Sequence, residues 1–141
     1  VRTPECWIWT GAVSSPDGYG RISVRHEGEE TTLSTHRAAI LVAGISLSRG
    51  DVLEHHCNEP LCVRVDAQHV HVSTQSRNMT YAVNCGRAAG PRRVVGSDRR
   101  VERSRAVRAL ALEGFDPLAY AQIVQDYCVQ QGGVDDQLPL W

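Results

Sequence analysis

Two cysteines and a histidine stand close together in the middle of the chain, in the order Cys57, Cys62 and His69. Four residues separate the two cysteines, and the residues around them are polar and include a proline. Thiolate and imidazole groups at such short spacings are typical ligands of tetrahedral zinc, because one loop can bring them together. We therefore expect one structural zinc ion. The alternatives are that both cysteines are buried thiols and His69 is a hydrogen-bonded surface histidine, or that His71, on the same strand face, replaces His69.

His55 lies two residues before Cys57, just outside this loop, and is available for chemistry. A neutral imidazole with a pKa near 6.5 can accept a proton from water. A histidine taken alone is more often structural, so the expectation depends on the neighbouring loop and on the spacing to Asn78. Asn78 falls in a predicted helix. Because asparagine is a poor helix former, its presence there is expected to have a structural or functional reason. His56 is expected to point to the opposite face of the extended arm from His55 and to have no role in the chemistry.

Short elements are predicted around these groups. Residues 50–55 and 69–72 are expected to form two extended arms on either side of the loop, and a helix capped by Ser73 or Thr74 runs to about residue 82. The fold class is therefore α+β. The preceding elements are a short aromatic strand at 6–9, a hairpin with strands at 19–25 and 31–33, and a helix at 35–42 with Ser34 as its cap and Gly44 at its end.

The C-terminal third of the chain is predicted to be a helical appendage. Glycines, Pro91 and paired arginines between residues 85 and 97 indicate a linker. Two amphipathic helices are expected at 98–113 and 117–129, with Gly114 after the first and Asp116 as cap of the second. Residues 130–141 are expected to form a flexible polar tail. The predicted organisation is thus a core at 1–84, a linker at 85–97, a two-helix region at 98–129 and the tail.

Composition fits a single compact domain, since the chain has 141 residues and is 42% hydrophobic. No apolar stretch reaches the roughly 20 residues needed to cross a bilayer, and the start has no signal-peptide core. We expect a cytoplasmic protein with no membrane partner. Five cysteines form an odd set, and in a reducing compartment a metal explains the clustered ones better than disulfides. Cys85 and Cys128 are expected to be a free thiol and a buried helix residue.

The basic residues are unevenly distributed, although the net charge is only -1. All fifteen are arginine, and eight fall between Arg87 and Arg108. Guanidinium groups pair bidentately with phosphates, so this segment suits a nucleic-acid backbone. A solvated helix face, or codon bias in the host, is the alternative. The candidate nucleic-acid-binding residues are Arg25, Arg77, Arg87, Arg92, Arg93, Arg99, Arg100 and Arg103.

Several motifs in residues 5–80 occur in an order that resembles a known family. They are Cys6-Trp7-Ile8-Trp9-Thr10-Gly11, Gly18-Tyr19-Gly20-Arg21, Thr35-His36-Arg37-Ala38-Ala39, His55-His56-Cys57, Asn58-Glu59-Pro60-Leu61-Cys62-Val63, His69-Val70 and Ser73-Thr74-Gln75-Ser76-Arg77-Asn78-Met79. Together they resemble the HNH endonucleases of phages and mobile introns, in the His-Me finger (ββα-metal) superfamily, and especially its zinc-bearing His-Cys box branch.

The resemblance implies a role for each matching position. His55 corresponds to the catalytic histidine and Asn78 to the asparagine that binds the catalytic Mg²⁺, for which Mn²⁺ or another divalent ion substitutes. Cys6 corresponds to a distant fourth zinc ligand beside Cys57, Cys62 and His69. Arg21 is the expected contact to the scissile phosphate, with Arg25 as the alternative. Glu54 stands where many members carry aspartate, and it is either a second magnesium ligand or points to solvent.

The chain also departs from the family pattern. Arg64-Val65 replace the usual Asn-Pro after Cys62, and six residues rather than four precede His69. The asparagine that braces the loop in the family is therefore missing or displaced. The implied activity is hydrolysis of DNA phosphodiester bonds by a protein of phage or mobile-element origin. The alternatives are a non-catalytic zinc module that binds DNA, and an RNA-directed or toxin nuclease of the same fold.

The last five residues suggest a further partner. Gln137, Leu138, Pro139, Leu140 and Trp141 resemble the short peptides by which bacterial replication proteins bind the sliding clamp. Leu140 and Trp141 would be the pocket anchors, with Gln137 and Leu138 before them. The alternative is a tail that packs on its own domain. Because one such site cuts one strand, a homodimer is one of the routes to a double-strand break.

Overall fold

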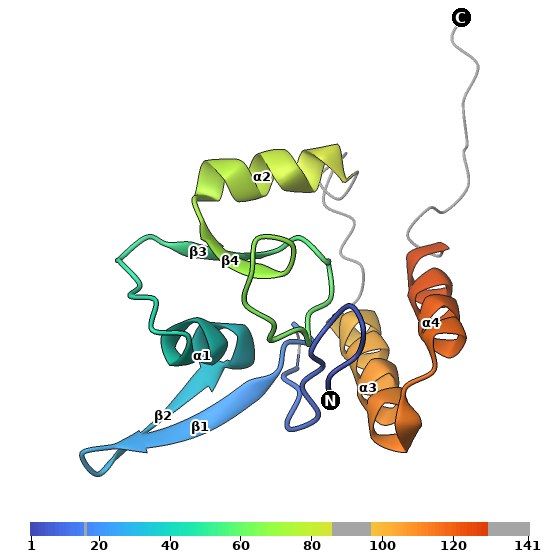
Figure 1. The fold of residues 1–141 in the computed structure, drawn as a ribbon, viewed down its shortest axis with the longest axis horizontal. Coiled ribbons are helices and arrows are strands. Elements are labelled where there is room, and N and C mark those ends of the chain that lie inside the picture. The colour runs from blue at the N-terminus through green and yellow to red at the C-terminus, as the bar shows by residue number, and fades with distance from the viewer. Residues whose placement is uncertain (16, 86–96, 130–141) are drawn as a thin grey trace, which may run out of the picture.

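The computed structural model describes residues 1–15, 17–85 and 97–129, and it confirms the predicted α+β class. The described residues form two antiparallel two-stranded sheets and four helices (Figure 1). Among these residues, no helix combines the length and apolar character needed to cross a bilayer. The elements in chain order are β1 (Arg21–His26), β2 (Glu29–Ser34), α1 (Thr35–Val42), β3 (Val52–His55), β4 (Val70–Ser73), α2 (Gln75–Asn84), α3 (Ser97–Gly114) and α4 (Pro117–Val129).

The first hairpin, β1–β2, leads directly into α1. Its register runs from Arg21 opposite Ser34 to the tip, where Glu27 and Gly28 have φ angles of 51° and 85°. Two consecutive left-handed residues are what a tight hairpin turn requires, because this turn matches the twist of the strands. Helix α1 has the predicted bounds, although Ser34 at its N-cap makes no side-chain capping bond. Helix α1 packs on both strands of this hairpin and also contacts β4.

The second hairpin, β3–β4, encloses the long loop that carries Cys57 and Cys62. Glu54 lies opposite His71 and His55 opposite Val70, so each pair shares one face of the hairpin. Helix α2 follows β4 at once and packs against β3. Its N-cap is Thr74, whose hydroxyl accepts a hydrogen bond from the backbone N–H of residue 77. The predicted order of strand, loop, strand and helix is therefore present.

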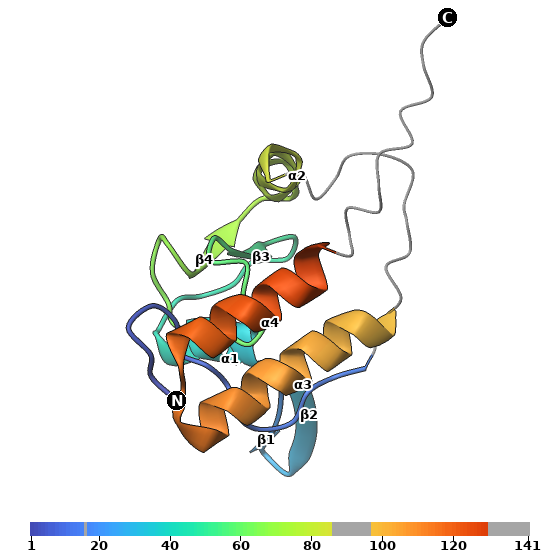
Figure 2. The same ribbon diagram turned by 90° about the vertical axis from the view of Figure 1, so that its right-hand side faces the viewer.

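Helices α3 and α4 lie side by side and share the core of the preceding segments (Figure 2). Val107 and Ala111 of α3 are buried with Ile8 and Leu61. A β-carbon at Gly18 would lie 2.8 Å from the Arg100 carbonyl oxygen, so the N-terminal loop and α3 are in close contact. Both helices have nearly the predicted bounds, but they are an integral part of the core rather than an appendage to it.

A buried carboxylate joins the cysteine loop to these helices. Glu59 is fully buried, and its Oε1 accepts a hydrogen bond from the backbone N–H of Leu61 at 3.0 Å. Its Oε2 accepts bonds from Arg103 at 2.8 Å and from the Tyr120 hydroxyl at 3.0 Å. Burial, and then the charge of Glu59, raises the pKa of Tyr120 far above its usual value. Arg103 was predicted to bind nucleic acid, but its side chain is only 14% exposed and holds α3 on the loop instead.

Replacing Arg103 with alanine is expected to lower the free energy of unfolding by about 3 kcal/mol, because Glu59 would remain buried without its cation. Urea unfolding followed by circular dichroism measures this change. Arg105→Ala, on the exposed face of the same helix, is the matched control and should shift the free energy by less than about 0.5 kcal/mol. Equal effects of the two substitutions would show that the buried ion pair does not stabilise the fold.

Candidate functional site

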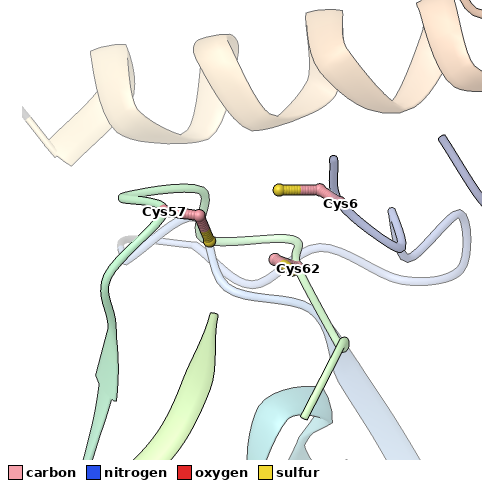
Figure 3. A group of neighbouring side chains, drawn as sticks. All are labelled: Cys6, Cys57 and Cys62. Atoms are coloured by element: carbon pink, nitrogen blue, oxygen red, sulfur yellow. The ribbon is translucent and has the colours of Figure 1, made fainter. Parts of the chain in front are cut away.

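Three cysteines from two distant segments meet at one point (Figure 3). Cys6 comes from the N-terminal segment, and Cys57 and Cys62 come from the loop between β3 and β4. Their three Sγ atoms all lie within 4.8 Å of one another. Zinc–sulfur bonds of about 2.3 Å in a tetrahedron place sulfur atoms about 3.8 Å apart, so the spacing of this group is compatible with a bound metal ion. The distant Cys6 is thus brought to the predicted pair.

The backbone of the loop is shaped around these sulfurs. Asn58 has a φ of 55°, and this left-handed residue turns the chain back directly after Cys57. The backbone amide of Glu59 bonds to the Cys57 sulfur, and the amides of Arg64 and Trp7 bond to the Cys62 sulfur. Hydrogen bonds from Cys57 and then Cys6 lower the pKa of Cys62, whereas the pKa values of the Cys6 and Cys57 thiols are raised. A metal ion would bind these sulfur atoms as thiolates.

His69 is buried next to this loop but outside the group of three sulfurs. Its Nδ1 donates a hydrogen bond to Asp66 Oδ1 at 2.7 Å, and this bond lowers the pKa of Asp66 to about 2. Metal-binding histidines commonly donate one ring N–H to a carboxylate and use the other nitrogen as ligand. His69 therefore has a carboxylate partner, but its ring nitrogens do not join the three sulfur atoms in one group. His71, the alternative, lies instead with Glu54 and His56.

His55 is surrounded by aromatic rings at the end of β3. It is 8% exposed, and its ring centroid lies 5.0 Å from that of His36 and 5.8 Å from that of Tyr19. The rings of Tyr19 and His36 are themselves 5.0 Å apart. The sequence motif Thr35-His36-Arg37 contributed to the family resemblance without a role for His36. The contact between His36 and His55 depends on the packing of α1 against the second hairpin, which the sequence alone does not give.

Positive charge gathers beside these rings. Arg21 is half-buried and pairs with Asp17 at 2.6 Å. Burial lowers the pKa of His36 to about 4, and the nearby charges of His55 and Arg21 contribute to the same shift. Arg25 lies farther along the hairpin, is 74% exposed, and pairs with Glu30 at 3.6 Å. Of the two arginines expected to contact phosphate, Arg21 is therefore the one whose charge reaches the histidines.

The imidazole of His36 is expected to titrate near pH 4 in the folded protein, well below the usual 6.5. The unfolded chain then binds this proton more readily than the folded one, so acidification from pH 6.5 towards 4 favours unfolding. A pH titration of the histidine ring signals by NMR measures the midpoint directly. His36→Gln identifies the signal, and a His36 midpoint near 6.5 would contradict the burial of this ring.

Glu54 and His56 lie on the other side of the hairpin, against α2. Glu54 is buried, which removes the alternative that it points to solvent, and His56 is more than a neighbour of His55, because it forms with Glu54 and His71 a group that could hold a metal ion. The cleft beside them has a volume of about 410 Å³. Asn78 is half-buried on α2 and does not line this cleft. The lining residues are Glu54, His56, His71, Val72, Ser73, Ser76, Arg77, Thr80, Tyr81 and Asn84.

The remaining predicted residues fall into two groups. Arg77 and Arg100 are exposed, and the guanidinium of Arg99 lies 5.9 Å from the centroid of the Tyr127 ring. These arginines present charge on the surface of α2 and α3. The others lie outside the described residues, namely Arg87, Arg92, Arg93, Gln137, Leu138, Leu140 and Trp141.

Comparisons with protein-family models, with curated proteins and with solved structures each find no match to this chain. Function is therefore inferred from the groups of side chains themselves. The thiol group can hold a metal that fixes a loop. The imidazole of His55 can exchange a proton, and Arg21 supplies charge beside it.

Proposed function

We propose that this chain is a divalent-metal-dependent endonuclease that hydrolyses DNA phosphodiester bonds, as its resemblance to HNH enzymes implies. The observation that carries the proposal is the meeting of Cys6 with Cys57 and Cys62, which stand on the loop that directly follows His55. A loop tied in this way fixes the end of β3, where His55 is buried between rings. The strand–loop–strand–helix order around it supports the same proposal.

Each residue has a distinct task in this proposal. The three thiolates and His69 hold a zinc ion that keeps the loop folded. His55 accepts a proton from the attacking water, and Arg21 stabilises the charge of the phosphate. Asn78 is the predicted ligand of Mg²⁺, which when bound would neutralise charge on the phosphate and on the leaving oxygen, whereas Glu54, the second predicted ligand, lines a cleft that Asn78 does not line.

DNA binding would depend on phosphate contacts. Arg77 and Arg100 are exposed and stand on two different helices. Arginine contacts to phosphates give an affinity that falls steeply with salt and carries little sequence information. Arg103 is not part of this surface, because it is paired with buried Glu59.

A non-catalytic DNA-binding zinc module is the second candidate, and the surroundings of His55 favour it. A histidine that is 8% exposed and in contact with two other rings resembles a structural core residue. Such a module has the same thiol group and the same arginines but no use for a proton acceptor. The two candidates therefore both bind DNA, and they differ in whether they cleave it.

Nicking of a supercoiled plasmid distinguishes them. The nuclease is expected to convert the plasmid to open circles with Mg²⁺ or Mn²⁺ and to stop when EDTA is added, whereas the binding module only retards the plasmid in a gel. Duplex DNA, single-stranded DNA and structured RNA are digested in parallel. Cleavage of RNA alone would replace the DNA proposal by the RNA-directed alternative, and no cleavage under any of these conditions would contradict a nuclease.

A further inference from the structure

The cleft beside α2 contains a group of metal-ligating side chains separate from the three cysteines. Glu54 on β3 and His71 on β4 are cross-strand partners, so their side chains share the face that α2 covers. His56 follows β3 directly and turns to the same cleft. One donor atom from each of the three residues lies within 4.8 Å of the other two.

The carboxylate of Glu54 is the unusual member of the group. Its side chain is 3% exposed. Oε1 lies 3.3 Å from Nε2 of His56, and Oε2 lies 4.0 Å from Nε2 of His71. Yet Oε1 accepts no hydrogen bond within the described part of the chain. A buried carboxylate oxygen without a hydrogen bond is costly, unless a cation satisfies it.

We propose that Glu54, His56 and His71 form a binding site for a first-row transition-metal dication such as Ni²⁺, Co²⁺, Zn²⁺ or Fe²⁺. Two imidazole nitrogens and one carboxylate oxygen that face a common point are a usual ligand set for these ions. Mg²⁺ prefers oxygen ligands and does not suit a site with two imidazoles. The site therefore differs in ligands and in metal preference from a magnesium site made by Glu54 and Asn78.

Neighbouring groups hold the imidazoles in place. The ring of His56 stacks on Tyr81 with centroids 4.3 Å apart and an angle of 18° between the planes. The Tyr81 hydroxyl donates to the carbonyl oxygen of His56 at 2.6 Å. The ring of His71 stands at 87° to that of His56, with centroids 4.8 Å apart. Rings fixed in this way lose little freedom when they bind an ion.

The cleft also leaves room for a further ligand on the metal. Three protein ligands do not fill the coordination sphere, and the cleft of about 410 Å³ is open beside them. Arg77 lines it together with Ser76 and Thr80. A guanidinium and hydroxyl groups next to a dication favour an anionic oxygen ligand, and a phosphate group has this chemistry.

The site is tested by direct binding, which does not depend on the proposed nuclease activity. The zinc-containing full chain is titrated with Ni²⁺ by calorimetry, and paramagnetic broadening in ¹⁵N NMR spectra locates the ion. We expect one Ni²⁺ per chain, with broadening of the signals of Val72 and Tyr81. His71→Gln and His56→Gln should each weaken binding at least about tenfold. Both side chains are partly exposed, so neither change is expected to unfold the protein.

Two controls separate this site from its neighbours. His55→Gln alters the imidazole on the opposite face of the hairpin, and Asn78→Ala removes the amide that does not line the cleft. Both variants should keep the Ni²⁺ affinity, and a large excess of Mg²⁺ should not displace the ion. Absence of binding, binding that survives His71→Gln, or complete displacement by Mg²⁺ would each overturn the proposal. Melting curves of all variants verify that they are folded.

Discussion

Cys62→Ser is expected to abolish binding of the proposed zinc ion and to unfold the protein at room temperature. Binding of structural zinc is worth about 10–16 kcal/mol in small domains, which equals or exceeds the total stability of most domains, about 5–15 kcal/mol. Cys62 is fully buried in the core cluster that joins the cysteine loop to Val107 of α3. Loss of the ion therefore affects the C-terminal helices as well as the loop. Zinc content by mass spectrometry and helicity by circular dichroism measure the result.

Cys85→Ser is the matched control, because Cys85 is an exposed free thiol at the end of α2. It should leave zinc content and melting temperature unchanged. Treatment of the unaltered protein with a strong chelator should reproduce the effect of Cys62→Ser. A protein that keeps its melting temperature after chelation would show that the three cysteines are buried thiols and that no metal supports the fold.

Local signals made much of the secondary structure predictable. Helix α1 follows Ser34 and ends before Gly44, whose φ is 76°, and α4 begins at Pro117 after Asp116, which accepts a hydrogen bond from the N–H of Leu118. Such end signals act over a few residues and are therefore visible in the sequence. The strands of both hairpins were likewise predicted to within about two residues from their alternation.

Long-range packing was not predictable in the same way. The helices α3 and α4 were expected to be an appendage, but Glu59 binds Arg103 and Tyr120 across long stretches of chain. No local pattern records that a carboxylate in a loop will be buried against two helices. The same holds for His56, since its place in the cleft depends on where α2 packs. The sequence therefore indicates which residues are candidates for a site, but tertiary contacts determine which of these side chains lie close together.

His55→Ala is expected to reduce plasmid nicking by about 10²–10⁴-fold at saturating Mg²⁺, because positioned general bases contribute rate factors of this size. The variant should keep its zinc, since His55 is not part of the thiol group. His55→Asn is made in parallel, because it leaves a smaller cavity beside Tyr19 and His36 than alanine does. Single-turnover rates on supercoiled DNA measure the effect.

Arg25→Ala is the control for these rates, because Arg25 is 74% exposed and far along the first hairpin. It should change DNA affinity only slightly and leave the cleavage rate near that of the unaltered protein. If His55→Ala and His55→Asn both cut DNA at the normal rate, His55 is a core residue and the proton acceptor lies elsewhere. If both variants lose their zinc or unfold, His55 is needed for the stability of the fold, since the three cysteines themselves are unchanged. The loss of cleavage would then say nothing for a role of His55 in proton transfer. A loss of cleavage with normal zinc content and melting temperature is the one outcome that assigns the chemistry to this imidazole.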